Sequence, residues 1–179
     1  MLHRIDLCFN HKPRVGLFSE IVFGSGLNVV AGPNGSGKST LLKAIHRCND
    51  CKREETAVTR YAYFDAETMN PHREETRLPD FHGAIIRSRS LFSSHGETMR
   101  DVLGSVAFDS GDCLLLDEPE SGQDLLWIIK IRSGIDAIAD RGCQVIVASH
   151  HPVFWKGSKL IELVPGYVAE SRSTYKTWL

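Results

Sequence analysis

The order of apolar and polar residues predicts short buried strands that alternate with helices. Near the N-terminus, "RIDLCF" partly alternates and "SEIVF" is apolar and branched, a composition typical of strands. Short apolar runs follow in "GLNVVAG", "TRYAYFDAE", "CLLLDEP" and "QVIVASH", and they are read as strands that end in glycine or polar residues. Helical patterns occupy "GKSTLLKAIHRC", "GETMRDVLGSVAF" and "DLLWIIKIRSGIDAIADRG", the last with a glycine stop.

This alternation predicts an α/β fold of the P-loop NTPase kind. We expect a mostly parallel central sheet flanked by helices, with antiparallel strands at the N-terminus. The segment "KLIELVPGYVAE" is expected to close the chain as a hairpin or a pair of strands. Residues 69–82 are polar with two prolines and predict an irregular segment. The length of 179 residues fits a single domain over residues 1–179.

Composition and charge narrow the class of protein. The chain is 42% hydrophobic and 24% charged, as in ordinary globular proteins, and its formal net charge of −1 disfavours a dedicated nucleic-acid binder. A local basic patch, at residues 52–53 or 87–89, leaves a nucleic-acid partner open. No apolar run approaches the roughly 20 residues that cross a bilayer, and no signal-peptide core is present. With five scattered cysteines, we expect a cytoplasmic protein that does not insert into a membrane.

The stretch "GPNGSGKST" predicts a phosphate-binding loop. It matches G-x-x-x-x-G-K-[ST] and stands between an apolar strand and a helix, as that motif requires. Glycines let backbone N–H groups turn towards phosphate oxygens, and the helix adds its positive end. Lys38 is expected to reach the β- and γ-phosphates and Ser39 to bind Mg²⁺. The predicted nucleotide-binding residues are Gly32, Pro33, Asn34, Gly35, Ser36, Gly37, Lys38, Ser39 and Thr40.

Acidic and histidine residues follow two of the predicted strands. Asp117 and Glu118 come directly after "CLLL", where one carboxylate can hold Mg²⁺ and leave the other to activate water. "VIVASHHP" ends the other strand with His150 and His151, either of which could contact a γ-phosphate oxygen. Because ligands bind at the carboxyl ends of parallel strands, we expect these groups to share one site.

Together these motifs resemble the ATP-binding-cassette ATPases over most of the chain. Residues 32–39 match the Walker A motif and residues 114–117 the Walker B motif, with Glu118 in the place of the catalytic glutamate. "SSHGE" looks like the family signature LSGGQ, with Ser94 and Gly96 holding its serine and second glycine. "SGQD" resembles the D-loop with Asp124 as its aspartate, and His150 lies 33 residues after Asp117, like the switch histidine. Within the superfamily, the sequence looks closest to small stand-alone bacterial ATPases related to the chromosome-maintenance and overcoming-lysogenisation-defect proteins.

The sequence also departs from the family pattern. The signature has histidine and glutamate at positions 95 and 97, and only about 55 residues separate it from Lys38, which predicts a reduced helical lid over about residues 65–92. The expected Q-loop glutamine is missing, and Glu67 is our candidate for its place, as a metal ligand, with Asp65 second. No tyrosine stands where the family stacks on adenine, so Phe9 and Phe18 are the candidates.

The resemblance implies an ATP-dependent homodimer with the two copies head to tail. Ser94 and Gly96 of one copy would then bind the γ-phosphate that is held by Lys38 of the other. Glu118 would activate water, and Asp124 would lie near the dimer axis. The resemblance also implies ATP and Mg²⁺ as cofactors, with Ser39, Asp117 and Glu67 around the metal.

A second candidate site lies in "HRCNDC", which contains His46, Cys48 and Cys51. A C-x-x-C invites zinc, but structural zinc takes four ligands and no second C-x-x-C is present. Either a second copy supplies the other half, or the segment is a helix end followed by a polar loop.

Three functions compete. The first is a Mg²⁺-dependent ATPase that drives an unknown protein partner, plausible in DNA maintenance or defence. The second is the nucleotide-binding subunit of a membrane transporter, against which the short lid and missing glutamine argue. The third is an ATP-gated binding module that hydrolyses slowly or not at all, which the altered signature suggests.

Overall fold

A five-stranded parallel sheet forms the centre of the molecule. The computed structural model describes residues 1–15, 20–56, 60–66, 108 and 110–178. Its central strands are β3 (Leu27–Ala31), β5 (Tyr61–Asp65), β6 (Cys113–Asp117), β7 (Gln144–Ala148) and β8 (Lys159–Glu162). They lie in the order β5-β6-β7-β3-β8, and every neighbouring pair is parallel. The α/β fold expected from the apolar runs is confirmed.

A smaller antiparallel sheet lies beside it, as the sequence also predicted. It contains β1 (Leu2–Asp6), β2 (Glu20–Val22) and β4 (Lys52–Glu55), in the order β2-β1-β4. The strand β4 was not expected, because its sequence "KREE" has no apolar residue. It pairs with β1, and the Arg53 guanidinium donates a hydrogen bond to the Ile45 carbonyl oxygen at 2.6 Å. The basic pair at residues 52–53 is therefore part of a sheet edge.

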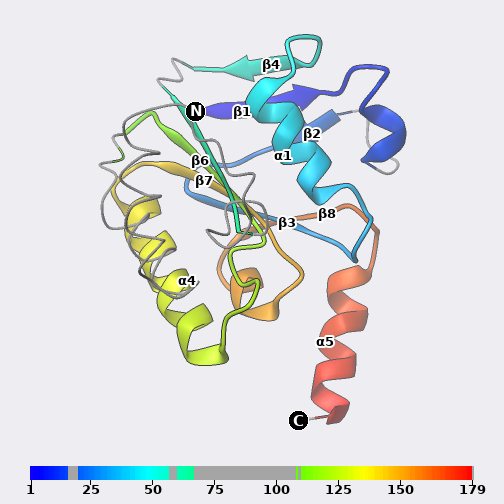
Figure 1. The fold of residues 1–179 in the computed structure, drawn as a ribbon, viewed down its shortest axis with the longest axis vertical. Helices are drawn as coiled ribbons and strands as arrows, with labels where there is room; N and C mark the ends of the chain where they lie inside the picture. Colours follow the sequence, from blue (N-terminus) through cyan, green and yellow to red (C-terminus); the bar gives the residue numbers. More distant parts are fainter. Residues whose placement is uncertain (16–19, 57–59, 67–107, 109, 179) are drawn as a thin grey trace, which may run out of the picture.

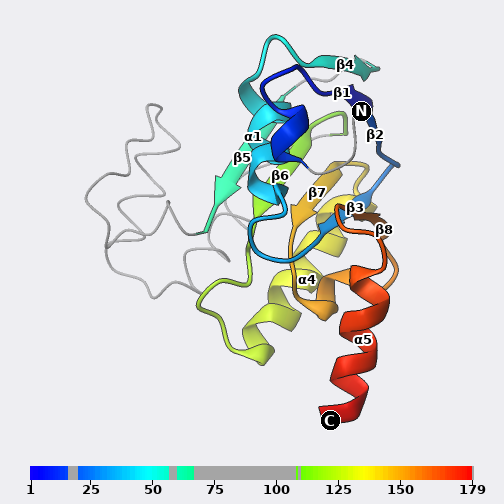
Figure 2. The same ribbon diagram turned by 90° about the vertical axis from the view of Figure 1, so that its right-hand side faces the viewer.

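Helices cover both faces of the parallel sheet (Figures 1 and 2). On one face, α1 (Lys38–Arg47) packs with the antiparallel sheet against Leu115 and Ile146. On the other face, α4 (Leu125–Asp140) and the short η2 (Pro152–Trp155) pack against Leu114 and Val145. Alternate residues of each strand thus enter different cores, which explains why β3, β6 and β7 are apolar along most of their length.

The C-terminal segment differs from the prediction. β8 is followed by α5 (Tyr167–Trp178), so the expected hairpin is wrong. Gly166 has a φ of 83°, which turns the chain, and the Glu162 carboxylate accepts a hydrogen bond from the Val168 N–H in the first turn of α5. Val168 is the one buried residue of this helix, which extends away from the body in Figure 1. Among the described residues, no helix combines the length and apolarity needed to span a membrane.

Candidate nucleotide-binding site

The predicted phosphate loop runs from the end of β3 to the start of α1. Gly35 and Gly37 have φ values of 78° and 95°, which L side chains rarely adopt. Gly37 is also packed so closely against the backbone of Arg14, in the 3-10 helix η1 (Lys12–Arg14), that a Cβ atom would collide with its carbonyl oxygen. A Cβ on Gly32 would lie 2.5 Å from Ser36 Oγ. The glycines of the motif therefore fix the shape of this loop.

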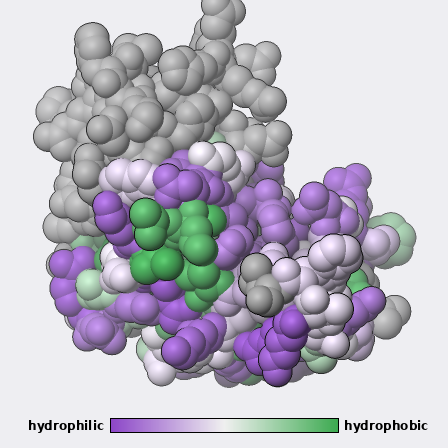
Figure 3. Space-filling model, turned by 90° about the horizontal axis from the view of Figure 1, so that it is seen from below, coloured by the Kyte–Doolittle hydropathy of each residue, from purple (hydrophilic) through white to green (hydrophobic). Residues whose placement is uncertain are grey.

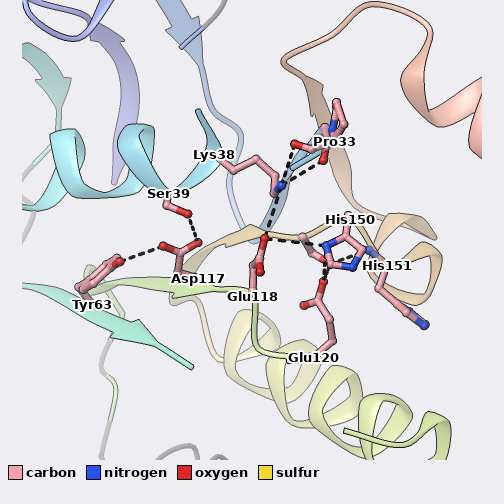
Figure 4. A network of polar contacts seen from close by, with 11 residues as sticks. Pro33, Lys38, Ser39, Tyr63, Asp117, Glu118, Glu120, His150 and His151 are labelled. Atoms are coloured by element: carbon pink, nitrogen blue, oxygen red, sulfur yellow. Dashed lines mark hydrogen bonds and ion pairs between the residues drawn. The ribbon is translucent and has the colours of Figure 1, made fainter. Parts of the chain in front are cut away.

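Lys38, the first residue of α1, is buried and folds back over the loop (Figure 4). Its ammonium group donates to the carbonyl oxygens of Gly32 and Pro33, each at 3.1 Å. It also lies 3.5 Å from Glu118 Oε1. The ammonium group of Lys38 is thus held between the loop and a carboxylate that follows β6.

The loop borders a cavity of about 550 Å³. This volume lies within the range of small-molecule sites. Residues of the phosphate loop, of η1 and of the loop after β6 line it: Pro13, Arg14, Asn34, Gly35, Gly37, Lys38, Ser39, Thr40 and Glu118. Pro13 and Arg14 belong to a segment that carries no motif in the sequence, and only the fold brings η1 against the loop.

A hydrogen-bonded pair of the type that holds Mg²⁺ is present beside the cavity. The Ser39 hydroxyl donates to Asp117 Oδ1 at 3.0 Å, and the Tyr63 hydroxyl donates to Asp117 Oδ2 at 2.9 Å (Figure 4). Burial raises the pKa of Asp117, and the two hydrogen bonds from Tyr63 and Ser39 oppose that shift. Burial, then the charge of Asp117, raises the pKa of Tyr63, so this residue acts as a neutral donor.

Asp65 lies next to this pair. It is opposite Asp117 in the register of β5 and β6, it accepts from the Tyr63 hydroxyl at 3.3 Å, and it lies 3.7 Å from Lys43 Nζ. Asp65, the second choice for the missing glutamine, is therefore beside the Ser39–Asp117 pair. Glu67, the first choice, lies outside the described residues. Tyr63 was missed because an aromatic residue in a strand gives no signal beyond core packing.

Glu118 has an unusual backbone conformation. Its φ is 47°, and it is the one non-glycine residue with a positive φ among those described. Its N–H donates to the Ala148 carbonyl oxygen at 2.9 Å, which joins the loop after β6 to the end of β7. Such a strained residue in a site is typical of functional positions.

The two adjacent histidines have different surroundings. His150 Nδ1 lies 3.8 Å from carboxylate oxygens of both Glu118 and Glu120, so it faces the acids of the site (Figure 4). His151 Nδ1 instead accepts a hydrogen bond from the Val153 N–H and begins η2. Burial, and then the neighbouring His150, lowers the pKa of His151. Of the two histidines, His150 is thus the one that faces Glu118.

Glu120 is a further acid that the sequence analysis did not select. It is buried, and its carboxylate accepts a hydrogen bond from the Ser149 hydroxyl. Burial raises its pKa, a shift that the Ser149 hydrogen bond opposes. Its carboxylate lies 3.8 Å from His150 Nδ1, a contact that only the fold reveals.

Some of the remaining predicted site residues are described by the structure, and the others are not. Asp124 is the N-cap of α4, and its carboxylate accepts from the Trp127 N–H at 2.9 Å. Phe9 is 88% exposed and does not line the cavity, so it is not placed to stack on a base there. Ser94, Gly96 and Phe18 lie outside the described residues, as does most of the expected lid.

The sequence of this chain is similar to ATP-binding proteins. A family model described as an AAA domain matches residues 15–50, which include the phosphate loop. The zinc import ATP-binding protein ZnuC of Vibrio vulnificus is 27% identical, with 89% of this chain and 71% of that protein covered. The ABC transporter ATP-binding protein ARB1 of Saccharomyces cerevisiae is 26% identical over 81% of this chain, which spans only 28% of the yeast protein.

Solved structures share the fold. An inward-facing metal-chelate type ABC transporter has a TM-score of 0.56 at 19% identity, with 91% of this chain and 80% of that chain covered. An ABC transporter ATP-binding protein from Pyrococcus furiosus has a TM-score of 0.54 at 18% identity, with coverages of 80% and 88%. The relatives named here are ABC-type ATP-binding proteins, the solved structures share the fold, and none of them supports the narrower overcoming-lysogenisation-defect or chromosome-maintenance type.

Proposed function

We propose that this protein hydrolyses ATP with Mg²⁺ at the cavity beside the phosphate loop. One observation carries the proposal: the ends of β3, β6 and β7 bring Lys38, the Ser39–Asp117 pair, Glu118 and His150 to one site. These residue types serve phosphate binding, metal binding and water activation. The relatives, whose printed names describe ATP-binding proteins, agree with this chemistry.

Each group has a role that its position supports. Lys38 would exchange the carbonyls of Gly32 and Pro33 for phosphate oxygens, while the N–H groups of the loop bind the same anion. Ser39 and Asp117 would hold Mg²⁺, which when bound neutralises phosphate charge. Glu118 would accept a proton from the attacking water, and His150 would donate a hydrogen bond to the γ-phosphate.

The active assembly that we propose is a head-to-tail homodimer formed on ATP. Ser94 and Gly96 of the second copy would close the cavity over the γ-phosphate. The first turns of α4 support a contact surface, because Leu125, Leu126 and Ile129 are exposed directly after Asp124. Figure 3, which views the molecule from below, shows hydrophobic side chains gathered into a patch on that face. A patch of this kind on a monomer indicates an interaction surface.

A second candidate function is that of a subunit that works with a membrane protein as its partner. Among our three alternatives, a subunit that energises a membrane transporter agrees best with the names of the relatives, which include a zinc import ATP-binding protein. A role in DNA maintenance or defence gains no support from the comparisons. The partner is therefore expected to be a membrane protein that binds this chain.

The substitution Glu118→Gln tests the hydrolysis proposal. It removes the base but keeps the size of the side chain, so phosphate release should fall by about 100-fold or more while ATP binding persists. Steady-state phosphate release with Mg²⁺ and calorimetric titration with ATP would measure both quantities. The matched control is Glu170→Gln on the exposed face of α5, which should keep the wild-type rate.

Two outcomes would contradict the proposal. Equal rates for Glu118→Gln and wild type would exclude Glu118 as the base. Tight ATP binding by the wild type without Mg²⁺-dependent phosphate release would favour the ATP-gated binding module instead. The partner is tested separately, by whether the Glu118→Gln protein with ATP co-purifies with detergent-solubilised membrane proteins.

A further inference from the structure

Four metal-ligating side chains that take no part in the candidate nucleotide site meet at one place. Cys8 and His11 come from the segment between β1 and η1, Cys48 ends α1, and Cys51 precedes β4. One ligand atom of each residue lies within 4.8 Å of those of the other three. The chain thus brings together two pairs that are separated by 36 residues, as Cys8-x-x-His11 and Cys48-x-x-Cys51.

The separations are close to those of a tetrahedral zinc site. Zn–S bonds of about 2.3 Å and Zn–N bonds of about 2.0 Å at tetrahedral angles place neighbouring ligand atoms roughly 3.5–3.8 Å apart. Here Cys8 Sγ lies 3.9 Å from Cys48 Sγ, and Cys51 Sγ lies 3.6 Å from His11 Nδ1. The Cys8 Sγ to His11 Nδ1 distance of 3.0 Å is shorter, and a small side-chain rotation would open it.

The donor set selects the kind of metal. Three thiols and one imidazole are soft or borderline ligands, which suit Zn²⁺ rather than Mg²⁺ or Ca²⁺. A disulfide would explain only two of the four residues, and all five cysteines are free here. The other two, Cys113 and Cys143, are buried in or beside the core strands β6 and β7 and take no part in the cluster.

We propose that Cys8, His11, Cys48 and Cys51 bind one structural Zn²⁺ ion within a single chain. The sequence showed only the C-x-x-C half of this set and left open a second copy as the source of the other half. The fold supplies the other half from the N-terminal segment instead. His46, the third candidate in "HRCNDC", is not part of this cluster, and its ring stacks on Tyr63 with the centroids 5.4 Å apart.

The ion would connect the ends of elements that surround the phosphate loop. It would tie the start of η1 to the end of α1, the helix that begins at the loop. Arg14, three residues after His11, provides the carbonyl that packs against Gly37, and Pro13 and Arg14 line the nucleotide cavity. Zinc would therefore hold one wall of that cavity in place, whether or not the protein hydrolyses ATP.

Metal content and cobalt spectroscopy test the site on the full chain. The reduced protein, loaded with Zn²⁺ and passed through a desalting column, should retain one zinc per chain by elemental analysis. Replacement by Co²⁺ should produce the thiolate-to-metal charge-transfer band and the visible bands of a tetrahedral site. Chelator removal of the metal should lower the melting temperature by more than about 5 °C, since structural zinc contributes directly to folding.

Variants separate this site from adventitious binding. Cys51→Ser and His11→Ala should lose the stoichiometric zinc, whereas the matched control Cys143→Ala should keep it. Wild-type protein that retains less than about a tenth of a zinc per chain, or that gives no tetrahedral cobalt spectrum, would overturn the proposal even if the variants fail to fold. Unchanged zinc content in folded Cys51→Ser would also overturn it.

Discussion

At the scale of single residues, neighbouring positions in the chain acquire different tasks from their surroundings. His150 faces Glu118 and Glu120, whereas His151 uses its ring to accept the Val153 N–H. A ring nitrogen can accept that hydrogen bond only while it is unprotonated. The His151 ring therefore caps the backbone of η2, whereas the His150 ring faces the acids that follow β6.

This difference predicts a pH dependence for His151. The pKa of His151 is lowered in the folded chain from the ordinary value of 6.5. As the pH falls below 6.5, the unfolded chain therefore binds more protons at this residue than the folded chain does, and acid favours unfolding. The variant His151→Asn keeps a cap acceptor but does not titrate. Denaturant unfolding should show wild type losing stability relative to this variant as the pH falls below about 6.5.

The difference in stability between wild type and His151→Asn removes the contributions of the other titrating groups. Asp117 and Glu120 have raised pKa values and act in the opposite direction, but they are common to both proteins. Above pH 7.5 the difference between the two proteins should be constant, which serves as the control. A difference that stays constant from pH 8 to pH 5 would show that His151 has its ordinary pKa.

At the scale of elements, one buried amide joins the two sheets. Gln144 begins β7, and its Oε1 accepts from the Leu2 N–H at 2.8 Å. Its Nε2 donates to the carbonyl oxygens of Leu2 and Gly24, each at 2.8 Å. A single side chain thus satisfies three backbone groups where β1 and the segment after β2 meet the parallel sheet.

The substitution Gln144→Ala should therefore be costly. It leaves up to three backbone groups without partners, and we expect the free energy of unfolding to fall by about 2–4 kcal/mol. Urea unfolding followed by circular dichroism would measure it. Gln123→Ala is the matched control, because the amide of Gln123 donates to the exposed Ser121 carbonyl oxygen and its loss should change the free energy of unfolding by less than about 0.5 kcal/mol. Equal losses in the two variants would disprove the bridging role.

At the scale of the whole molecule, the cavity beside the phosphate loop and the apolar patch on α4 are both open at the surface. Leu126 is 71% exposed at the second position of α4, next to the cap residue Asp124. Burial of this patch against a second copy would stabilise a dimer by the hydrophobic effect. The patch is thus the described surface that best supports the proposed assembly.

A charge on the patch should separate dimer formation from nucleotide binding. Leu126→Glu places an acid in the first turn of α4, where the helix dipole favours it, so the fold should be kept. In the Glu118→Gln background with ATP and Mg²⁺, this change should shift the protein from dimer to monomer by analytical ultracentrifugation. Phe9→Glu, at another exposed apolar residue, is the control. A dimer that persists in Leu126→Glu would place the contact elsewhere.

The sequence by itself determined the parallel strands, the phosphate loop and the acids after β6, because each depends on residues close together in the chain. An apolar run, a glycine pattern and a capped helix are local signals. The strand β4 and the helix α5 were missed because their local composition is polar or ambiguous, and pairing with β1 or capping by Glu162 decided them.

Only the tertiary structure decided which distant side chains meet. Packing of elements that are remote in sequence brings Tyr63, Glu120 and the η1 residues to the candidate nucleotide site. It also places Cys8 and His11 beside the cysteine pair at residues 48 and 51. Such contacts depend on strand order and on the approach of whole elements, which residue types alone do not specify.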